Sequence, residues 1–229
     1  MKITFTGHAG FYLEGPQKIL IDPFISENPN TPVKNKDLAP ELILITHGHN
    51  DHLGDALEIA QNTGAPILTS FDLAKYLSRP GVNTIGINIG GTYSFKNTKI
   101  KMTQAWHSSS ITMANGTFYG GTAAGFLIQT AGLTLYHAGD TALFGDMEKV
   151  IARTPIDVAF LPIGGHFTMG PDDALIAAHW LKARQIIPMH YNTFPLINQD
   201  AEAFALAVKD RTESNCLILK AGEWLEVAK

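Results

Sequence analysis

The sequence predicts an α/β protein in which two central β-sheets form a sandwich with helices outside. Short β-rich runs bounded by glycine and proline are followed by amphipathic helical stretches, and this order occurs twice along the chain. The chain has 229 residues, of which 45% are hydrophobic and 17% charged, so it has ample apolar surface to bury. We therefore expect residues 1–229 to form one ordered domain.

The predicted strands are short and apolar, as strands buried in a sandwich are. In chain order they are 2–6, 10–14, 18–22, 42–46, 65–70, 81–88, 99–106, 123–130, 133–137, 157–163, 184–189 and 216–220. The last one contains Cys216, the only cysteine, which we interpret as an ordinary buried strand residue.

The predicted helices cover 53–62, 71–78, 144–152, 171–183 and 199–209. The fourth has the clearest start, because Pro171 in its first turn is followed by two aspartates whose charge suits a helix N-terminus. Residues 25–40 contain three prolines and form the longest irregular stretch. We interpret this stretch as a solvated surface loop, with a substrate lid as the alternative.

The net charge of the chain argues against nucleic acid and anionic membranes as binding partners. A net charge of −4 gives no general attraction to nucleic acid or to anionic lipid. The sequence has no apolar run of membrane-spanning length, and its first residues do not resemble a secretory leader. We expect a cytoplasmic protein that acts on a small molecule without nucleic acid or membrane, and the sequence leaves a homo-oligomer open.

The strongest chemical signal is LILITHGHNDHLGDA, residues 42–56, where an apolar strand leads directly into H-x-H-x-D-H. His47 and His49 can converge on one metal ion, while Asp51 and His52 can address a second one. The alternative is that these are ordinary solvated loop residues. That interpretation does not account for four ligand-type side chains within six positions directly after a buried strand. The motif therefore predicts a metal site.

Three more ligand-type residues follow predicted strands. His107 comes after 99–106, Asp140 lies shortly after 133–137, and His190 comes after 184–189. Strand ends fix their loops rigidly, so these side chains are expected to meet the motif at one edge of the sheets.

These motifs resemble the metallo-β-lactamase superfamily along nearly the whole chain. THGHNDH resembles its first signature, and HAGDT and PMHY resemble later ones. The resemblance implies a four-layer αββα sandwich. It also implies that one metal is bound by His47, His49 and His107, the other by Asp51, His52 and His190, and that Asp140 bridges them.

Other stretches resemble one narrower branch of that superfamily. TGHAGFYLE, IDPF, YHAGDT, AFLPIGG, FTMGPDDA and PMHYNTFP are similar to bacterial metal-dependent hydrolases related to L-ascorbate-6-phosphate lactonase. The chain departs from that branch at Gly165 and His166, which precede FTMG.

The resemblance implies a hydrolase of a small ester, lactone or phosphoester. Two divalent transition-metal ions, zinc first and manganese or iron otherwise, would activate a hydroxide between them. Asp51 and Asp140 are the expected catalytic carboxylates, with Asp51 also passing a proton to the leaving group. A nuclease of the same superfamily and a non-hydrolytic di-metal protein are the alternatives.

Four further residues, outside the expected metal ligands, have two interpretations each. His8, His166 and Tyr191 are candidate substrate contacts, but they could be a turn residue, a solvated loop residue and a packing residue respectively. Asp22, which precedes a proline, either orients a metal-bound histidine through a hydrogen bond or shapes a turn.

Overall fold

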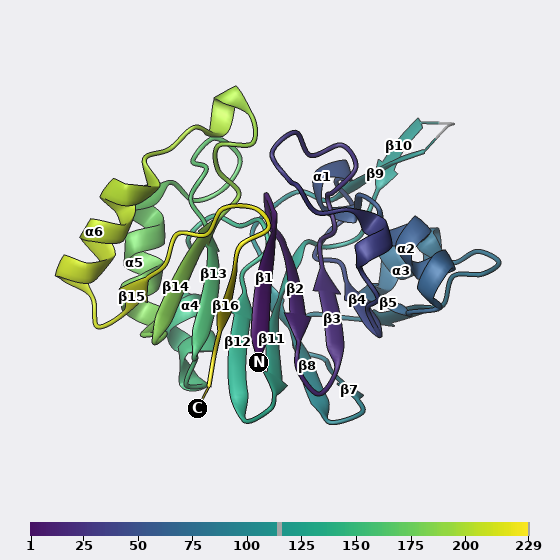
Figure 1. Cartoon of the computed structure of the whole chain (residues 1–229), viewed down its shortest axis with the longest axis horizontal. Helices are drawn as coiled ribbons and strands as arrows, with labels where there is room; N and C mark the ends of the chain where they lie inside the picture. The colour runs from purple at the N-terminus through teal and green to yellow at the C-terminus, as the bar shows by residue number, and fades with distance from the viewer. Residues whose placement is uncertain (114–115, 229) are drawn as a thin grey trace.

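The computed structural model describes residues 1–113 and 116–228 and contains two seven-stranded sheets that face each other (Figure 1). The first sheet has the order β16-β1-β2-β3-β4-β5-β6, with β1 (Lys2–Gly7), β2 (Gly10–Glu14), β3 (Lys18–Ile21), β4 (Leu42–Leu44), β5 (Ile67–Ser70), β6 (Thr84–Ile87) and β16 (Trp224–Glu226). The second has the order β15-β14-β13-β12-β11-β8-β7, with β7 (Thr92–Phe95), β8 (Thr98–Gln104), β11 (Ala124–Thr130), β12 (Leu133–His137), β13 (Val158–Pro162), β14 (Gln185–Met189) and β15 (Asn215–Cys216). A separate hairpin consists of β9 (Ser110–Met113) and β10 (Gly116–Tyr119).

Helices cover the outer face of each sheet, which confirms the predicted four-layer αββα sandwich. On the first sheet they are α1 (Asn50–Leu53), α2 (Ala56–Thr63) and α3 (Phe71–Leu77). On the second they are α4 (Asp146–Lys149), α5 (Pro171–Leu181) and α6 (Ala201–Arg211). Short 3-10 turns occur at η1 (Asn35–Asp37), η2 (Ile151–Arg153) and η3 (Pro195–Ile197).

The main hydrophobic core lies between the two sheets. Alternate residues of a strand point to opposite faces, so Phe11 and Leu13 of β2 enter this core while Tyr12 joins the outer layer. The rings of Phe11 and Phe160, one from each sheet, are 4.1 Å apart. His137 on β12 is buried, and its Nε2 donates a hydrogen bond to the carbonyl of Ala9 at 2.8 Å, which ties the sheets together.

Strand direction brings the ligand-type residues to one edge. Strands β3 to β6 run parallel, as do β12 to β15, and β8 runs in the same direction as β12 because both are antiparallel to β11. The carboxyl ends of β3, β4, β8, β12 and β14 therefore carry the loops that contain Asp22, His47, His107, Asp140 and His190. Parallel strands place functional loops at one edge for this reason.

Several predicted boundaries are wrong. The expected helix 53–62 is broken into α1 and α2 at Gly54, where a Cβ would lie 2.4 Å from the Pro23 carbonyl oxygen. The expected strand 216–220 is reduced to the end of β15, and Cys216 is only partly buried. The sequence reading missed β7, β9, β10 and β16, which are short and partly exposed. Residues 25–40 are irregular as predicted, apart from η1.

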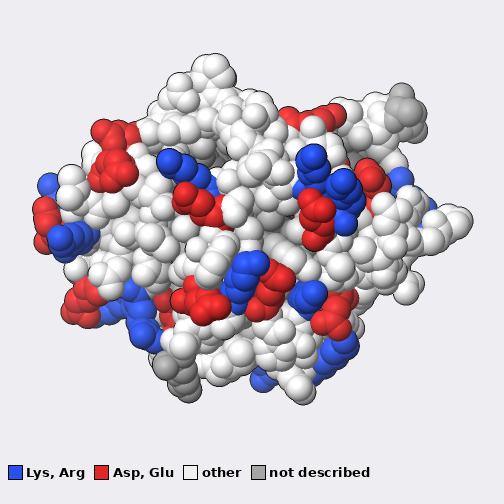
Figure 2. Space-filling model, in the orientation of Figure 1, with Lys and Arg blue, Asp and Glu red and all other residues white. Residues whose placement is uncertain are grey.

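Basic and acidic side chains are interspersed over the face seen in Figure 2. Within residues 1–113 and 116–228, none of the helices has the length and apolarity needed to cross a lipid bilayer.

We predict that Phe160→Ala lowers the free energy of unfolding by about 3–5 kcal/mol, because it leaves a cavity beside Phe11 in the inter-sheet core. Chemical denaturation monitored by circular dichroism measures the change. Leu206→Ala on the exposed side of α6 is the control and should change stability by no more than about 0.5 kcal/mol. Equal effects of the two substitutions would contradict this account of the core.

Candidate metal centre

The H-x-H-x-D-H motif spans the turn from β4 into α1. His47 lies on the turn, His49 precedes the first helical residue, and Asp51 and His52 lie within α1. Gly48 lets the turn pass close to the hairpin, since a Cβ there would lie 2.7 Å from the Ser110 carbonyl oxygen. The turn thus brings His47 and His49 together at one point, and Asp51 and His52 at a second point close to it.

His47, His49 and His107 form the first group of ligand-type side chains. His47 Nε2 and His49 Nδ1 are 2.9 Å apart, and one ring nitrogen from each of the three residues lies within 4.8 Å of the others. Burial lowers the pKa of all three histidines. The neutral imidazole that this favours is the form that binds metal.

Asp51, His52, His190 and His8 form the second group, again with one potential ligand atom each within 4.8 Å of the rest. His8 Nε2 lies 3.1 Å from Asp51 Oδ2, and His190 Nε2 lies 3.9 Å from the same oxygen. Burial would raise the pKa of Asp51, but His52 and His8 outweigh it and hold this pKa well below its usual range.

Asp140 lies between the two groups. Its Oδ2 is 2.9 Å from His190 Nε2, 3.2 Å from His52 Nε2 and 3.6 Å from His107 Nε2. Burial would raise the pKa of Asp140, yet His190 and His52 reverse the effect and keep this pKa well below its ordinary value. An ionised carboxylate oxygen therefore faces nitrogens from both groups.

Asp22 and Thr46 orient two of the histidines. The Asp22 carboxylate accepts hydrogen bonds from the Thr46 amide at 2.9 Å and the Thr46 hydroxyl at 2.6 Å, and it lies 2.8 Å from His52 Nδ1. Because the Thr46 hydroxyl proton goes to Asp22, its oxygen accepts from His47 Nδ1 at 3.0 Å. The Nε2 atoms of His47 and His52 are consequently the ones directed into the site.

The donor atoms of this site fit metal ions. Among the described residues, Asp140 Oδ1 is buried without a hydrogen-bond partner, and His52 Nε2 has none either, although it lies 3.2 Å from Asp140 Oδ2. Burial would lower the pKa of His52, but Asp140 and Asp22 raise it well above its ordinary value, so the site stabilises positive charge. Imidazole and carboxylate donors suit zinc, manganese and iron.

Three residues of the site have left-handed backbone conformations. His8, Asp22 and His190 have φ values of 59°, 42° and 55°. Such conformations cost about 1–3 kcal/mol each in non-glycine residues and persist where neighbouring contacts impose them. One such contact is the hydrogen bond of 2.6 Å from the His190 amide to the His8 carbonyl.

Contact of His8 and Tyr191 with substrate stays a prediction. His8 is buried, and both ring nitrogens have protein partners, Thr193 Oγ1 at 2.8 Å and Asp51 Oδ2 at 3.1 Å. Tyr191 packs against the cluster beneath α5 and α6. Burial raises the pKa of its phenol to about 12, with further contributions from Cys216 and Glu202 on that side of the sheet.

His166 is exposed in the loop between β13 and α5, with its ring 4.5 Å from the ring of Phe167. Its contact with substrate stays a prediction. The sequence reading missed Thr46 and Thr193. Thr46 directly precedes the motif, which is a usable signal, whereas nothing in the sequence indicates that Thr193 reaches a histidine 185 positions away.

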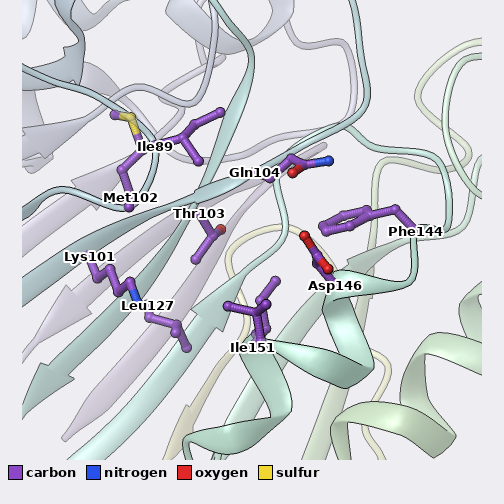
Figure 3. A pocket seen from close by; sticks show the side chains of 11 residues that line it. Ile89, Lys101, Met102, Thr103, Gln104, Leu127, Phe144, Asp146 and Ile151 are labelled. Atoms are coloured by element: carbon purple, nitrogen blue, oxygen red, sulfur yellow. The ribbon is translucent and has the colours of Figure 1, made fainter.

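A cavity of about 110 Å³ lies apart from these residues, on the outer face of the second sheet beside α4 (Figure 3). Its walls include Thr103, Leu127, Phe144 and Ile151. None of the histidines lines it, so it is separate from the metal centre.

Comparisons with known proteins agree with this geometry. Residues 2–190 match the model of the beta-lactamase superfamily domain. UPF0173 metal-dependent hydrolases of Pelotomaculum thermopropionicum and Thermococcus onnurineus are 47% and 49% identical, each over 99% of this chain and all of the relative. The metallo hydrolase Igni18 of Ignicoccus hospitalis is 36% identical, with a TM-score of 0.90 over 99% of both chains. The isothiocyanate hydrolase from Delia radicum gut bacteria, 23% identical over 100% of this chain and 99% of its own, has the same fold with a TM-score of 0.77. With its fold, its cluster of ligand-type side chains and these relatives, the chain belongs to the metallo-β-lactamase superfamily and, within it, to the UPF0173 metal-dependent hydrolases.

Proposed function

We propose that this metal-dependent hydrolase cleaves a small ester, lactone or phosphoester with two divalent transition-metal ions, of which zinc is the first candidate and manganese or iron the next. One observation carries the proposal. Asp140 Oδ2 lies within 3.6 Å of ring nitrogens from His52, His107 and His190, so a single carboxylate oxygen touches both groups of ligand-type residues.

The two groups divide the ligands between two ions. His47, His49 and His107 would hold one ion, and Asp51, His52 and His190 the other, with Asp140 shared. When bound, the ions supply a lowered pKa for a coordinated water and polarisation of a carbonyl or phosphoryl oxygen.

The three acidic residues differ in access to the site. The Asp51 side chain is 31% exposed, whereas those of Asp140 and Asp22 are 3% and 0% exposed. Asp51 is therefore the carboxylate that can meet a substrate, take a proton from the attacking water and return it to the leaving group. Asp140 is the carboxylate shared by the two ions, and Asp22 orients Thr46 and His52.

The expected substrate is a small molecule. A net charge of −4 and the interspersed charges of Figure 2 argue against an extended nucleic-acid surface. The two UPF0173 relatives named above are described as metal-dependent hydrolases without a stated substrate, which is compatible with this proposal.

Asp140→Ala should reduce bound metal from two ions per chain to one or fewer and abolish turnover, because no shared negative charge then offsets the repulsion between the two cations. Elemental analysis after reconstitution with zinc, manganese or iron measures the content. Asp146→Asn, an exposed change on α4, is the matched control and should retain both ions and full activity. Full metal content and activity in Asp140→Ala would rule out a shared carboxylate.

Thr193→Val should weaken binding of the ion held by Asp51 about 10- to 100-fold. The Thr193 hydroxyl lies 2.8 Å from His8 Nδ1, while His8 Nε2 faces the Asp51 carboxylate at 3.1 Å. A neutral His8 ring that donates from Nε2 to Asp51 accepts at Nδ1 from Thr193, and valine has the same shape but no hydroxyl. Competition with a chelating dye measures the affinity. Thr193→Ser should restore it, and a valine variant with unchanged affinity would show that this hydrogen bond has no such role.

A further inference from the structure

We infer that the substrate is uncharged and carries an apolar group that packs against exposed hydrophobic side chains around the metal centre. This inference rests on the proposed function and narrows its substrate class. The side chains, called the apolar rim below, are Trp106, Phe167, Phe194 and Leu196.

The rim residues are large and apolar, yet between 37% and 63% exposed. Other exposed large hydrophobic residues occur elsewhere on the surface, but these four lie in the loops that carry or adjoin His107, Asp140 and His190. Exposed apolar side chains beside loops that carry ligand-type residues are typical of a binding site.

Trp106 is attached to the residues next to Asp140. It directly precedes His107, its amide donates to Thr141 Oγ1 at 2.9 Å, and its carbonyl accepts from the Ala142 amide at 3.1 Å. These bonds fix the Trp106 backbone beside the loop that carries the shared carboxylate.

Phe167 lies in a loop that is hydrogen-bonded to Thr141, the residue after Asp140. The Met169 amide donates to the Thr141 carbonyl at 2.9 Å, and the Gly165 amide donates to the Met169 carbonyl at 3.0 Å. The loop therefore closes on itself beside Asp140, with Phe167 exposed at its tip.

Phe194 and Leu196 follow His190 in a closed turn, held by a hydrogen bond of 2.9 Å from the Asn192 amide to the Ile197 carbonyl. The Phe194 ring is 5.7 Å from the ring of His8, which contacts Asp51. All three parts of the rim are thus joined to residues of the metal centre.

The same loops lack basic residues. The segments 45–56, 105–109, 138–145, 163–170 and 190–199 contain no lysine or arginine. In Figure 2 the lobe at the top of the view, where Figure 1 places η3, is white. Proteins usually recognise phosphate and carboxylate groups through arginine or lysine, so these loops favour an uncharged substrate.

One lysine offers a competing interpretation. Lys220 lines a cavity of about 340 Å³ on the Thr193 side of His8, together with Phe5, Tyr191 and Leu219. If the substrate were anionic, this is the cation that would receive it. Lys220→Ala therefore distinguishes the two cases.

The test uses the metal-reconstituted protein and p-nitrophenyl esters of acetate, hexanoate and succinate, the last carrying a free carboxylate. The inference expects kcat/KM to be about tenfold or more higher for hexanoate than for acetate, because added methylenes gain from burial. Trp106→Ala and Phe194→Ala should bring kcat/KM for hexanoate down to that for acetate, while the metal content stays unchanged. Lys220→Ala should have no effect.

Binding of the matching anilides, measured by calorimetry, separates this inference from the proposed function. If none of the esters is cleaved but hexananilide binds more tightly than acetanilide and loses this advantage in Trp106→Ala, the inference stands and ester hydrolysis fails.

A preference for succinate that Lys220→Ala removes would overturn the inference. So would rim variants that keep the chain-length preference, or that dissociate an oligomer in sedimentation, since the rim would then be an interface between copies.

Discussion

The buried carboxylate of Asp22 determines how the histidine motif is presented. A charge removed from water needs hydrogen-bond partners, and Asp22 finds them in the Thr46 amide, the Thr46 hydroxyl and His52 Nδ1. These contacts join the end of β3 to the turn after β4 and to α1. Because they also fix which nitrogen of each ring faces the cavity, the positions of His47 and His52 follow from satisfying this one carboxylate.

The metal centre draws its residues from both sheets. The first sheet supplies the turn with His8 and the motif after β4, while the second supplies His107, Asp140 and His190. The distance between these two halves is set far from the ligands, by the contact of Phe11 with Phe160 and by the bond from His137 to Ala9. The inter-sheet core is therefore part of the geometry of the site, although none of its residues offers a metal ligand.

The sequence was enough to predict the sandwich and to propose the ligand set, because buried strands and H-x-H-x-D-H are local patterns. The sequence was a poor guide to features that depend on contacts between residues far apart in the chain. The short strand β16 exists through pairing with β1, and the break at Gly54 reflects the closeness of Pro23, which no periodicity encodes. The partners of the His8 ring are likewise not encoded locally, because Thr193 and Asp51 come from two other parts of the fold.

The left-handed backbone at His8, Asp22 and His190 bears on how the protein acquires metal. These conformations are supported by bonds such as that between the His190 amide and the His8 carbonyl. Each such bond restricts a loop before any ligand is counted, so it lowers the conformational entropy that metal binding has to remove, and more of the affinity of the nitrogen and oxygen donors goes into binding and selectivity.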